Sequence, residues 1–266
     1  MSRIEAYLST LKSQGKKALV PFVTAGDPQP DWTVDIMHAL AKSGADIIEV
    51  GVPFSDPMAD GPVIQLADER ALEHGVTLKQ ILGMVKTFRQ TNEVTPVVLM
   101  GYLNPVEVYG YQQFAKDAAE AGVDGVLTVD LPPEAAAPLA EELEKVQIDP
   151  IFLLAPTSTE ARIAKVAKFA KGYLYYVSLK GVTGAGNLDI GAVTEKLETI
   201  RKITDLPITV GFGIKDAESA AAVGAIAEGV VVGSAMVNII AANQTDKPKL
   251  LSELSDFTAL LKAAIE

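Results

Sequence analysis

One construction recurs along this chain and is clearest at residues 44–48, Gly44-Ala45-Asp46-Ile47-Ile48, where a glycine ends a predicted helix and an apolar strand begins. The same arrangement returns at Gly122-Val123-Asp124-Gly125-Val126 and at Glu228-Gly229-Val230-Val231. Glycine favours the left-handed conformation in which many helices end. The repetition indicates a strand–helix unit used many times, which is typical of a parallel sheet covered by helices.

Eight short apolar runs predict eight strands, each followed by a loop and a segment in which apolar residues recur at helical spacing. In residues 78–88 the apolar side chains share one face, and Thr77 stands where it can cap the helix. Eight units in 266 residues give about 33 residues each, enough for a strand and a helix. The predicted strands are residues 18–24, 47–52, 96–101, 125–129, 149–154, 174–177, 207–211 and 229–233. The predicted helices include residues 32–42, 62–71, 78–88, 111–121, 136–146, 158–170, 190–203, 217–223 and 234–240.

The pattern predicts the α/β class and a single (β/α)8 TIM barrel over residues 1–266, with an extra N-terminal helix. Residues 1–14 form this helix in the prediction, because Ile4, Leu8 and Leu11 share one stripe, and we expect it to cap the bottom of the barrel. A doubly wound open sheet is the alternative, since periodicity cannot show that a sheet closes.

Composition is that of a folded globular protein, with 48% hydrophobic and 21% charged residues. The 34 acidic and 23 basic residues give a net charge of -11, which disfavours binding to nucleic acids and to anionic membranes. No apolar stretch is long enough to span a membrane, and residues 1–20 do not resemble a secretory signal. We therefore expect a cytoplasmic protein.

The chain contains no cysteine, which excludes disulfides, thiolate metal sites and cysteine nucleophiles. It has only two histidines, and both are interpreted as structural: His38 lies within a predicted helix and His74 at a predicted helix end. No metal site is predicted.

An acidic residue, Glu49, interrupts the buried strand 47–52, and a turn-rich loop with two further acids, Asp56 and Asp60, follows it. Burying a carboxylate is costly, and barrel active sites lie at the carboxyl ends of the strands. An apolar site would raise the pKa of Glu49 while Asp60 stays ionised, so the two could divide acid and anion roles. The alternatives are a structural Glu49 paired with a buried lysine or with backbone donors, Asp60 as the cap of the helix that starts at Pro62, and Asp56 as a surface-turn residue.

Glycine-rich loops follow the last three predicted strands, at residues 178–186, 211–214 and 233–235. Backbone N–H groups can approach an anion closely at glycines, and a helix starting at Ser234 would add its N-terminus. The loops therefore predict a phosphate site, although any one glycine alone could serve a tight turn. The nearby cations are Lys180 and Lys215.

Aromatic side chains stand near the carboxyl ends of several predicted strands, and a ring of them would suit a flat aromatic ligand. Core packing inside the barrel is the alternative. These residues are Phe22, Tyr102, Tyr175 and Phe212.

In order and spacing, these motifs resemble the alpha-subunit family of tryptophan synthase. The resemblance is carried by residues 21–28, 49–62, 181–184, 211–214 and 233–235, and it extends over essentially the whole chain. It implies a carbon–carbon lyase of L-tryptophan biosynthesis that cleaves indole-3-glycerol phosphate into indole and glyceraldehyde 3-phosphate by a retro-aldol step, with neither a metal nor an organic cofactor on this chain.

The resemblance also assigns roles to residues. It makes Glu49 the general acid and base and gives Asp60 the task of stabilising the charged indolenine N–H. It places six residues around the indole and glycerol: Phe22, Tyr102, Leu127, Tyr175, Thr183 and Phe212. It places four on the phosphate: Gly184, Gly213, Gly233 and Ser234.

A beta subunit bearing pyridoxal phosphate is the implied partner, which would receive indole directly within an alpha2-beta2 heterotetramer. The matching interface residues are Asp56, Pro57, Asn104, Pro105, Pro132 and Pro133. One departure is Leu179, where many members carry arginine, and it puts in doubt any lid contact that needs this cation.

Two other functions fit parts of the pattern. A Schiff-base aldolase would need a desolvated lysine at a strand end, for which Lys180 is the near candidate. A regulatory subunit would bind the phosphate ligand and only activate a partner.

Overall fold

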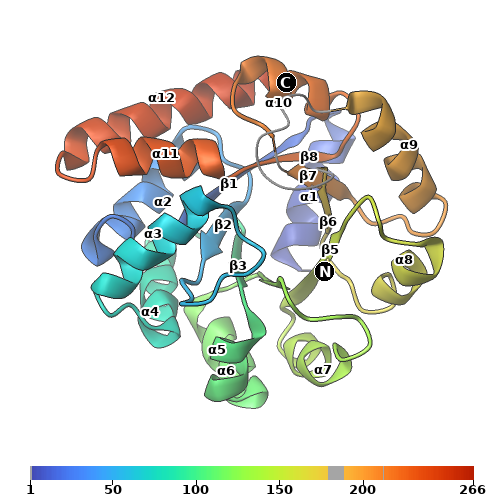
Figure 1. The fold of residues 1–266 in the computed structure, drawn as a ribbon, viewed down its shortest axis with the longest axis horizontal. Coiled ribbons are helices and arrows are strands. Elements are labelled where there is room, and N and C mark those ends of the chain that lie inside the picture. The colour runs from blue at the N-terminus through green and yellow to red at the C-terminus, as the bar shows by residue number, and fades with distance from the viewer. Residues whose placement is uncertain (1, 179–188, 212) are drawn as a thin grey trace.

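A computed structural model of the chain describes residues 2–178, 189–211 and 213–266. Its eight strands are parallel and form a closed barrel in the order β1 to β8, with β1 paired to β8 and helices on the outside (Figure 1). The predicted barrel is confirmed, and this pairing excludes the open sheet. The strands are β1 (Ala18–Thr24), β2 (Ile48–Gly51), β3 (Val97–Gly101), β4 (Gly125–Thr128), β5 (Asp149–Leu154), β6 (Leu174–Val177), β7 (Ile208–Gly211) and β8 (Gly229–Val232).

Helices follow the strands around the barrel, and most lie within two residues of their predicted bounds. The largest difference is at residues 158–170, where the helix is only Glu160–Val166 and begins after a Thr159 cap. Helices α5 and α12 were not among the predicted segments. The helices are α1 (Arg3–Ser13), α2 (Thr33–Lys42), α3 (Pro62–Glu73), α4 (Leu78–Arg89), α5 (Leu103–Tyr109), α6 (Tyr111–Ala121), α7 (Ala137–Lys145), α8 (Glu160–Val166), α9 (Ile190–Arg201), α10 (Ala217–Gly224), α11 (Ser234–Ala242) and α12 (Lys247–Ile265), with a 3-10 turn at Pro30–Trp32. No helix in the described ranges has both the length and the apolar character to span a bilayer.

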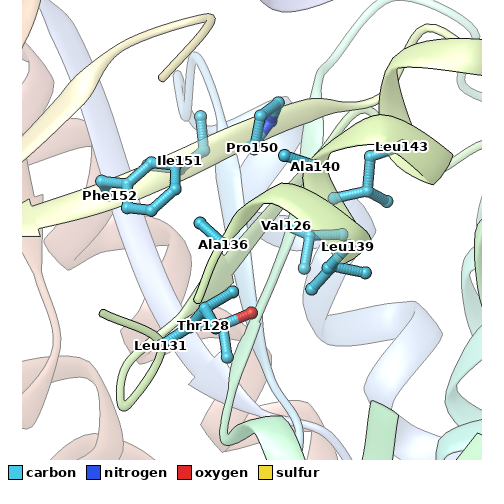
Figure 2. Close-up of a pocket in the computed structure, with 10 residues that line it drawn as sticks. All are labelled: Val126, Thr128, Leu131, Ala136, Leu139, Ala140, Leu143, Pro150, Ile151 and Phe152. Carbon is cyan, nitrogen blue, oxygen red and sulfur yellow. The ribbon is translucent and has the colours of Figure 1, made fainter. Parts of the chain in front are cut away.

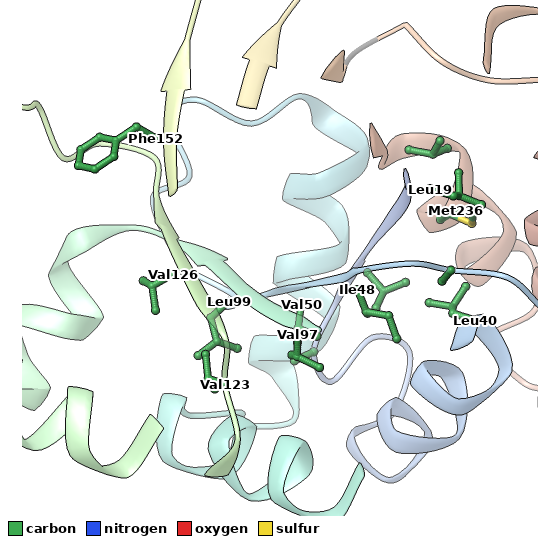
Figure 3. Close-up of a cluster of buried hydrophobic side chains, with 14 of the residues drawn as sticks. Leu19, Leu40, Ile48, Val50, Val97, Leu99, Val123, Val126, Phe152 and Met236 are labelled. Carbon is green, nitrogen blue, oxygen red and sulfur yellow. The ribbon is translucent and has the colours of Figure 1, made fainter. Parts of the chain in front are cut away.

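Side chains alternate along each strand between two apolar clusters, as the pleat requires. The outward set packs against the helices, and Figure 3 shows part of this cluster, in which Leu19 and Ile48 of the strands lie near Leu40 of α2 and Met236 of α11. The inward set fills the barrel and includes Val20, Ile47, Val98, Leu127, Ile151 and Val231. Burial on both sides explains why the strands are continuous apolar runs.

Helix α1 covers the amino-terminal end of the barrel. Its residues Ile4, Leu8 and Leu11 belong to the inward cluster, and Ile4 lies so close to Gly125 that a β-carbon there would be 2.9 Å from Ile4 Cδ1. Ser2 caps the helix by accepting a hydrogen bond from the Glu5 N–H at 3.1 Å. A reaction site must therefore lie at the opposite, carboxyl-terminal end.

The same amino-terminal end carries a repeated ionic arrangement. Three acidic residues stand just before a strand. Each accepts a hydrogen bond from a backbone N–H of the strand that comes one earlier in the chain, and each also forms an ion pair with a lysine or arginine. The sets are Asp46 with Leu19 N–H and Lys262, Asp124 with Val97 N–H and Arg89, and Glu228 with Ile208 N–H and Arg201. The acid that precedes each of these three strands thus joins neighbouring units.

Replacing Asp124 by alanine is expected to destabilise the fold by about 3–5 kcal/mol, because it leaves the Arg89 guanidinium buried without its carboxylate. Asp124 is 6% exposed and Arg89 11%, and Arg3 binds the same carboxylate. Urea unfolding measures the difference. The matched control is Glu142→Ala, which removes an exposed pair with Lys145 and should cost less than about 1 kcal/mol. Equal small losses in the two variants would contradict the prediction.

Candidate active site

Glu49 points into the barrel from β2, in register with Phe22 of β1 and Val98 of β3. Its carboxyl group is fully buried. Oε1 accepts a hydrogen bond from the Tyr173 hydroxyl at 2.7 Å, whereas Oε2 has no hydrogen-bond partner in the described part of the chain. A buried polar atom without a partner is costly, which makes Oε2 a candidate for contact with a ligand.

Burial raises the pKa of Glu49 to about 7, although the hydrogen bond from Tyr173 acts in the opposite direction. Near neutrality such a group can both give and accept a proton, as general acid–base catalysis requires. Among the described residues no lysine pairs with Glu49, so they contain no partner for the alternative in which this residue is half of a buried ion pair.

The raised pKa of Glu49 should make stability depend on pH. Between its ordinary pKa of 4.5 and its folded pKa of about 7, the folded state keeps a proton that the unfolded state releases. The contribution of Glu49 is therefore fully present below pH 4.5 and is lost as pH rises to 7, by roughly 3 kcal/mol in total. Glutamine does not titrate, so Glu49→Gln should not lose this stability. The free energy of unfolding of the variant should therefore rise relative to that of the wild type between pH 4.5 and 8. Parallel pH profiles would refute this expectation.

Asp60 lies in the loop between β2 and α3 and is bound by Tyr102, not by the helix that follows. The Tyr102 hydroxyl donates to Asp60 Oδ2 at 2.7 Å and accepts the Ala59 N–H at 3.0 Å. Gly61 is the N-cap residue of α3 and Pro62 its first residue, and no side chain caps this helix. The helix-cap interpretation of Asp60 is therefore wrong. Burial raises the pKa of Asp60, and the Tyr102 hydrogen bond lowers it in part.

Two glycines on inward positions make room for aromatic rings at the mouth of the barrel. A β-carbon on Gly51 would lie 2.6 Å from Phe22 Cζ, and one on Gly211 would lie 2.1 Å from the Tyr175 hydroxyl oxygen. Leu127 is buried in the same inward cluster as Tyr175. Thr183 and Phe212, which were also predicted around the ligand, lie outside the described residues.

The predicted phosphate residues gather where β7 and β8 end. Val210 and Val230 pair in register, and Gly213 and Gly233 stand three residues beyond each of them. Gly213 adopts a φ of +79°. Gly233 is the N-cap of α11, which begins at Ser234 without a side-chain cap, so its first N–H groups are available to an anion. Gly184, like Lys180 and Leu179, lies outside the described residues.

The residues predicted to meet a partner follow three successive strands, in the loop after β2, in helix α5 after β3 and in the loop after β4. Asp56, Asn104 and Pro132 are exposed, Pro57 and Pro105 are half-buried, and Pro133 is buried. Two apolar side chains on these segments are unusually exposed, Met58 at 80% and Val108 at 81%. A groove of about 370 Å³ is lined by Met58 together with Phe54, Ser55, Asp56, Pro57, Gln65, Glu69 and Leu72.

Sequence reasoning missed two buried polar residues of the site. Tyr173 stands two residues before Tyr175, so the strand alternation that places Tyr175 inside the barrel also indicates Tyr173. Asp68 lies on α3 beside the buried Ala67 and Ala71, where helical spacing would have placed it on the inner face.

Two further crevices are too small for a ligand, at about 10 Å³ each. Figure 2 shows the crevice between α7 and the strands β4 and β5, whose volume is about 10 Å³, no more than the space for one water molecule. Within residues 2–178, 189–211 and 213–266 there is also no cluster of three or more acids or histidines arranged to hold a metal.

Comparison with known proteins gives one consistent result. The family model described as "Tryptophan synthase alpha chain" matches residues 8–266. The tryptophan synthase alpha chain of Thioalkalivibrio sulfidiphilus is 60% identical over all of both chains, and that of Marinobacter nauticus is 57% identical over all of this chain and 98% of the relative. A crystal structure of tryptophan synthase subunit alpha from Legionella pneumophila superposes with a TM-score of 0.93 at 45% identity, covering 100% of this chain and 98% of the other. The chain therefore belongs to the tryptophan synthase alpha chain family.

Proposed function

We propose that this chain cleaves indole-3-glycerol phosphate into indole and glyceraldehyde 3-phosphate. The observation that carries the proposal is the Glu49 carboxyl group, which is fully buried inside the barrel with a pKa near neutrality and one oxygen without a partner among the described residues. An indole carbon leaves only after it has been protonated, and this step needs an acid held in a dry site.

The proposed reaction uses two carboxyl groups. Neutral Glu49 donates its proton to C3 of the indole ring, and the positive charge that appears on the indole nitrogen is stabilised by the Asp60 carboxylate. Ionised Glu49 then takes the proton of the glycerol hydroxyl next to the ring. The C–C bond breaks, its electrons return to the ring, and the hydroxyl carbon becomes the aldehyde. Glu49 ends protonated, so no cofactor is consumed.

Binding would orient the substrate through both of its ends. The phosphate would accept hydrogen bonds from backbone N–H groups at Gly213, Gly233 and Ser234, with Gly184 as a further contact. The indole ring would lie among apolar and aromatic side chains at the mouth. These are Phe22, Tyr102, Leu127 and Tyr175, together with Thr183 and Phe212.

The proposed partner is a beta subunit that carries pyridoxal phosphate and receives the indole, in a cytoplasmic alpha2-beta2 assembly. The exposed side chains of Met58, in the loop that carries Asp56, and of Val108, in helix α5 with Asn104, support a docking surface at the mouth. Pro57, Pro105, Pro132 and Pro133 complete the proposed interface.

The test is indole formation from indole-3-glycerol phosphate by the purified chain, with and without a beta subunit. We expect indole from the chain alone and a faster rate with the partner. No indole under either condition would contradict the proposal, and indole only with the partner would favour a purely regulatory role. Borohydride trapping of substrate on Lys180 would instead point to a Schiff-base aldolase.

A further inference from the structure

Asp68 is a third buried carboxyl group beside the proposed active site. It projects from the inner face of α3, is 4% exposed, and stands next to Ala67, which packs against Phe22 at the barrel mouth. Burying a carboxyl group costs free energy that an apolar side chain at the same position would avoid. The group therefore needs a compensating role.

The contacts of Asp68 join two elements of the site. The Thr24 hydroxyl, at the carboxyl end of β1, donates to Asp68 Oδ1 at 3.5 Å, a long hydrogen bond. The backbone N–H of Phe54, in the loop after β2, lies close enough to the Asp68 carboxyl group to lower its pKa. Asp68 thus lies between the end of β1 and the start of the loop that carries Asp60.

From Phe54 the connection continues to Asp60. The ring of Phe54 stacks on Tyr102, with 5.2 Å between ring centroids and 28° between planes. The hydroxyl of Tyr102 holds both the Asp60 carboxylate and the Ala59 N–H. A change at Asp68 therefore reaches Asp60 through three successive contacts, from Asp68 to Phe54, from Phe54 to Tyr102 and from Tyr102 to Asp60.

The charges around Asp68 also connect it to Asp60. Burial raises the pKa of Asp68 to about 7, and the nearby charges of Asp60 and, to a smaller extent, Asp27 raise it further, whereas the Phe54 N–H and the Thr24 hydroxyl lower it. Asp27 has its own cation, because Arg70 binds it through two hydrogen bonds of 2.7 and 2.9 Å. In the described ranges no cation pairs with Asp68 or Asp60, so no counterion offsets the effect of the Asp60 charge on the pKa of Asp68.

We propose that Asp68 is a positioning residue, which fixes the loop between β2 and α3 so that the Asp60 carboxylate faces the indole nitrogen of the substrate. The inference rests on the proposed lyase function. It predicts that removing the Asp68 side chain lowers turnover and leaves substrate affinity nearly intact, because the proposed phosphate contacts are backbone N–H groups of Gly213, Gly233 and Ser234, which lie on other elements than α3.

The experiment measures indole formation by four variants of the full chain in the presence of a beta subunit. Asp68→Ala, with Asp68→Ser as a second truncation should the first not fold, is expected to lower kcat by about 10- to 100-fold with KM within about threefold. Asp68→Asn keeps an oxygen for the Phe54 N–H and should retain kcat within about threefold. Glu73→Ala, an exposed position on the same helix, is the matched control and should match the wild type.

A double-mutant cycle separates positioning from general weakening of the fold. If Asp68 acts through Asp60, adding Asp68→Ala to Asp60→Asn should lower kcat by less than about twofold more, because coupled residues are not additive. Two outcomes would overturn this inference without affecting the proposed function. One is a double variant whose loss of kcat equals the product of the two single losses, and the other is an unchanged kcat in both Asp68→Ala and Asp68→Ser. A wild-type chain that makes no indole would overturn the proposed function as well, so the two failures are distinguishable.

Discussion

Glu49→Gln is expected to bind indole-3-glycerol phosphate and to lose turnover by more than the roughly 10²–10⁴-fold that simple proton transfer contributes. The amide has nearly the same shape and can still accept the Tyr173 hydrogen bond, so the barrel interior need not rearrange. It cannot deliver a proton to the ring carbon or take one from the hydroxyl. Both proton transfers of the proposed reaction would therefore fail in this variant.

The measurement is steady-state kcat and KM for indole formation, together with substrate affinity from direct titration. Glu73→Gln, which makes the same chemical change at an exposed position of α3, is the control and should keep full activity. Turnover close to that of the wild type in Glu49→Gln would remove Glu49 from the reaction.

Asp60→Asn is expected to give the second largest effect, a fall of about 10²–10³-fold in kcat, which is typical of losing one electrostatic stabiliser of the transition state. The amide oxygen can still accept the Tyr102 hydroxyl, so the loop should keep its shape. What is lost is the negative charge that, in the proposed reaction, faces the protonated indole. We expect KM to change by less than kcat, because the charge on the nitrogen develops only during the reaction.

The outcome that would count against this role is a change confined to substrate affinity. A crystal structure of Asp60→Asn that retained the Tyr102 contact would show that loss of charge, and not displacement of the loop, causes the effect.

Much of the barrel follows from sequence periodicity, because buried parallel strands leave a simple signal. Strands β1, β5 and β6 have the predicted bounds, and the others end within one residue of them. Closure of the sheet is different, since the pairing of β1 with β8 joins the two ends of the chain and no local pattern encodes it. The count of eight units and the repeated helix-to-strand construction favoured a barrel.

The site was predictable where a residue violated its local pattern. Glu49 stands out as a charge in an apolar run, and the glycines before α11 stand out as a group. Partners distant in sequence left no such signal. Tyr102 is 42 positions from Asp60, and Tyr173 is 124 positions from Glu49, so these hydrogen bonds depend on the folded barrel. The cap interpretation of Asp60 failed for the same reason, because a tertiary contact replaced a local one.

The separation of the ionic clusters around Asp46, Asp124 and Glu228 from the reaction end has a consequence for how this protein can change. These clusters fasten one unit to the next at the closed end, while the mouth is built from loops that follow the strands. Thermal stability and substrate specificity then depend on different residues. Lineages under thermal selection can strengthen one end, and those meeting a new substrate can remodel the other, with little conflict between the two.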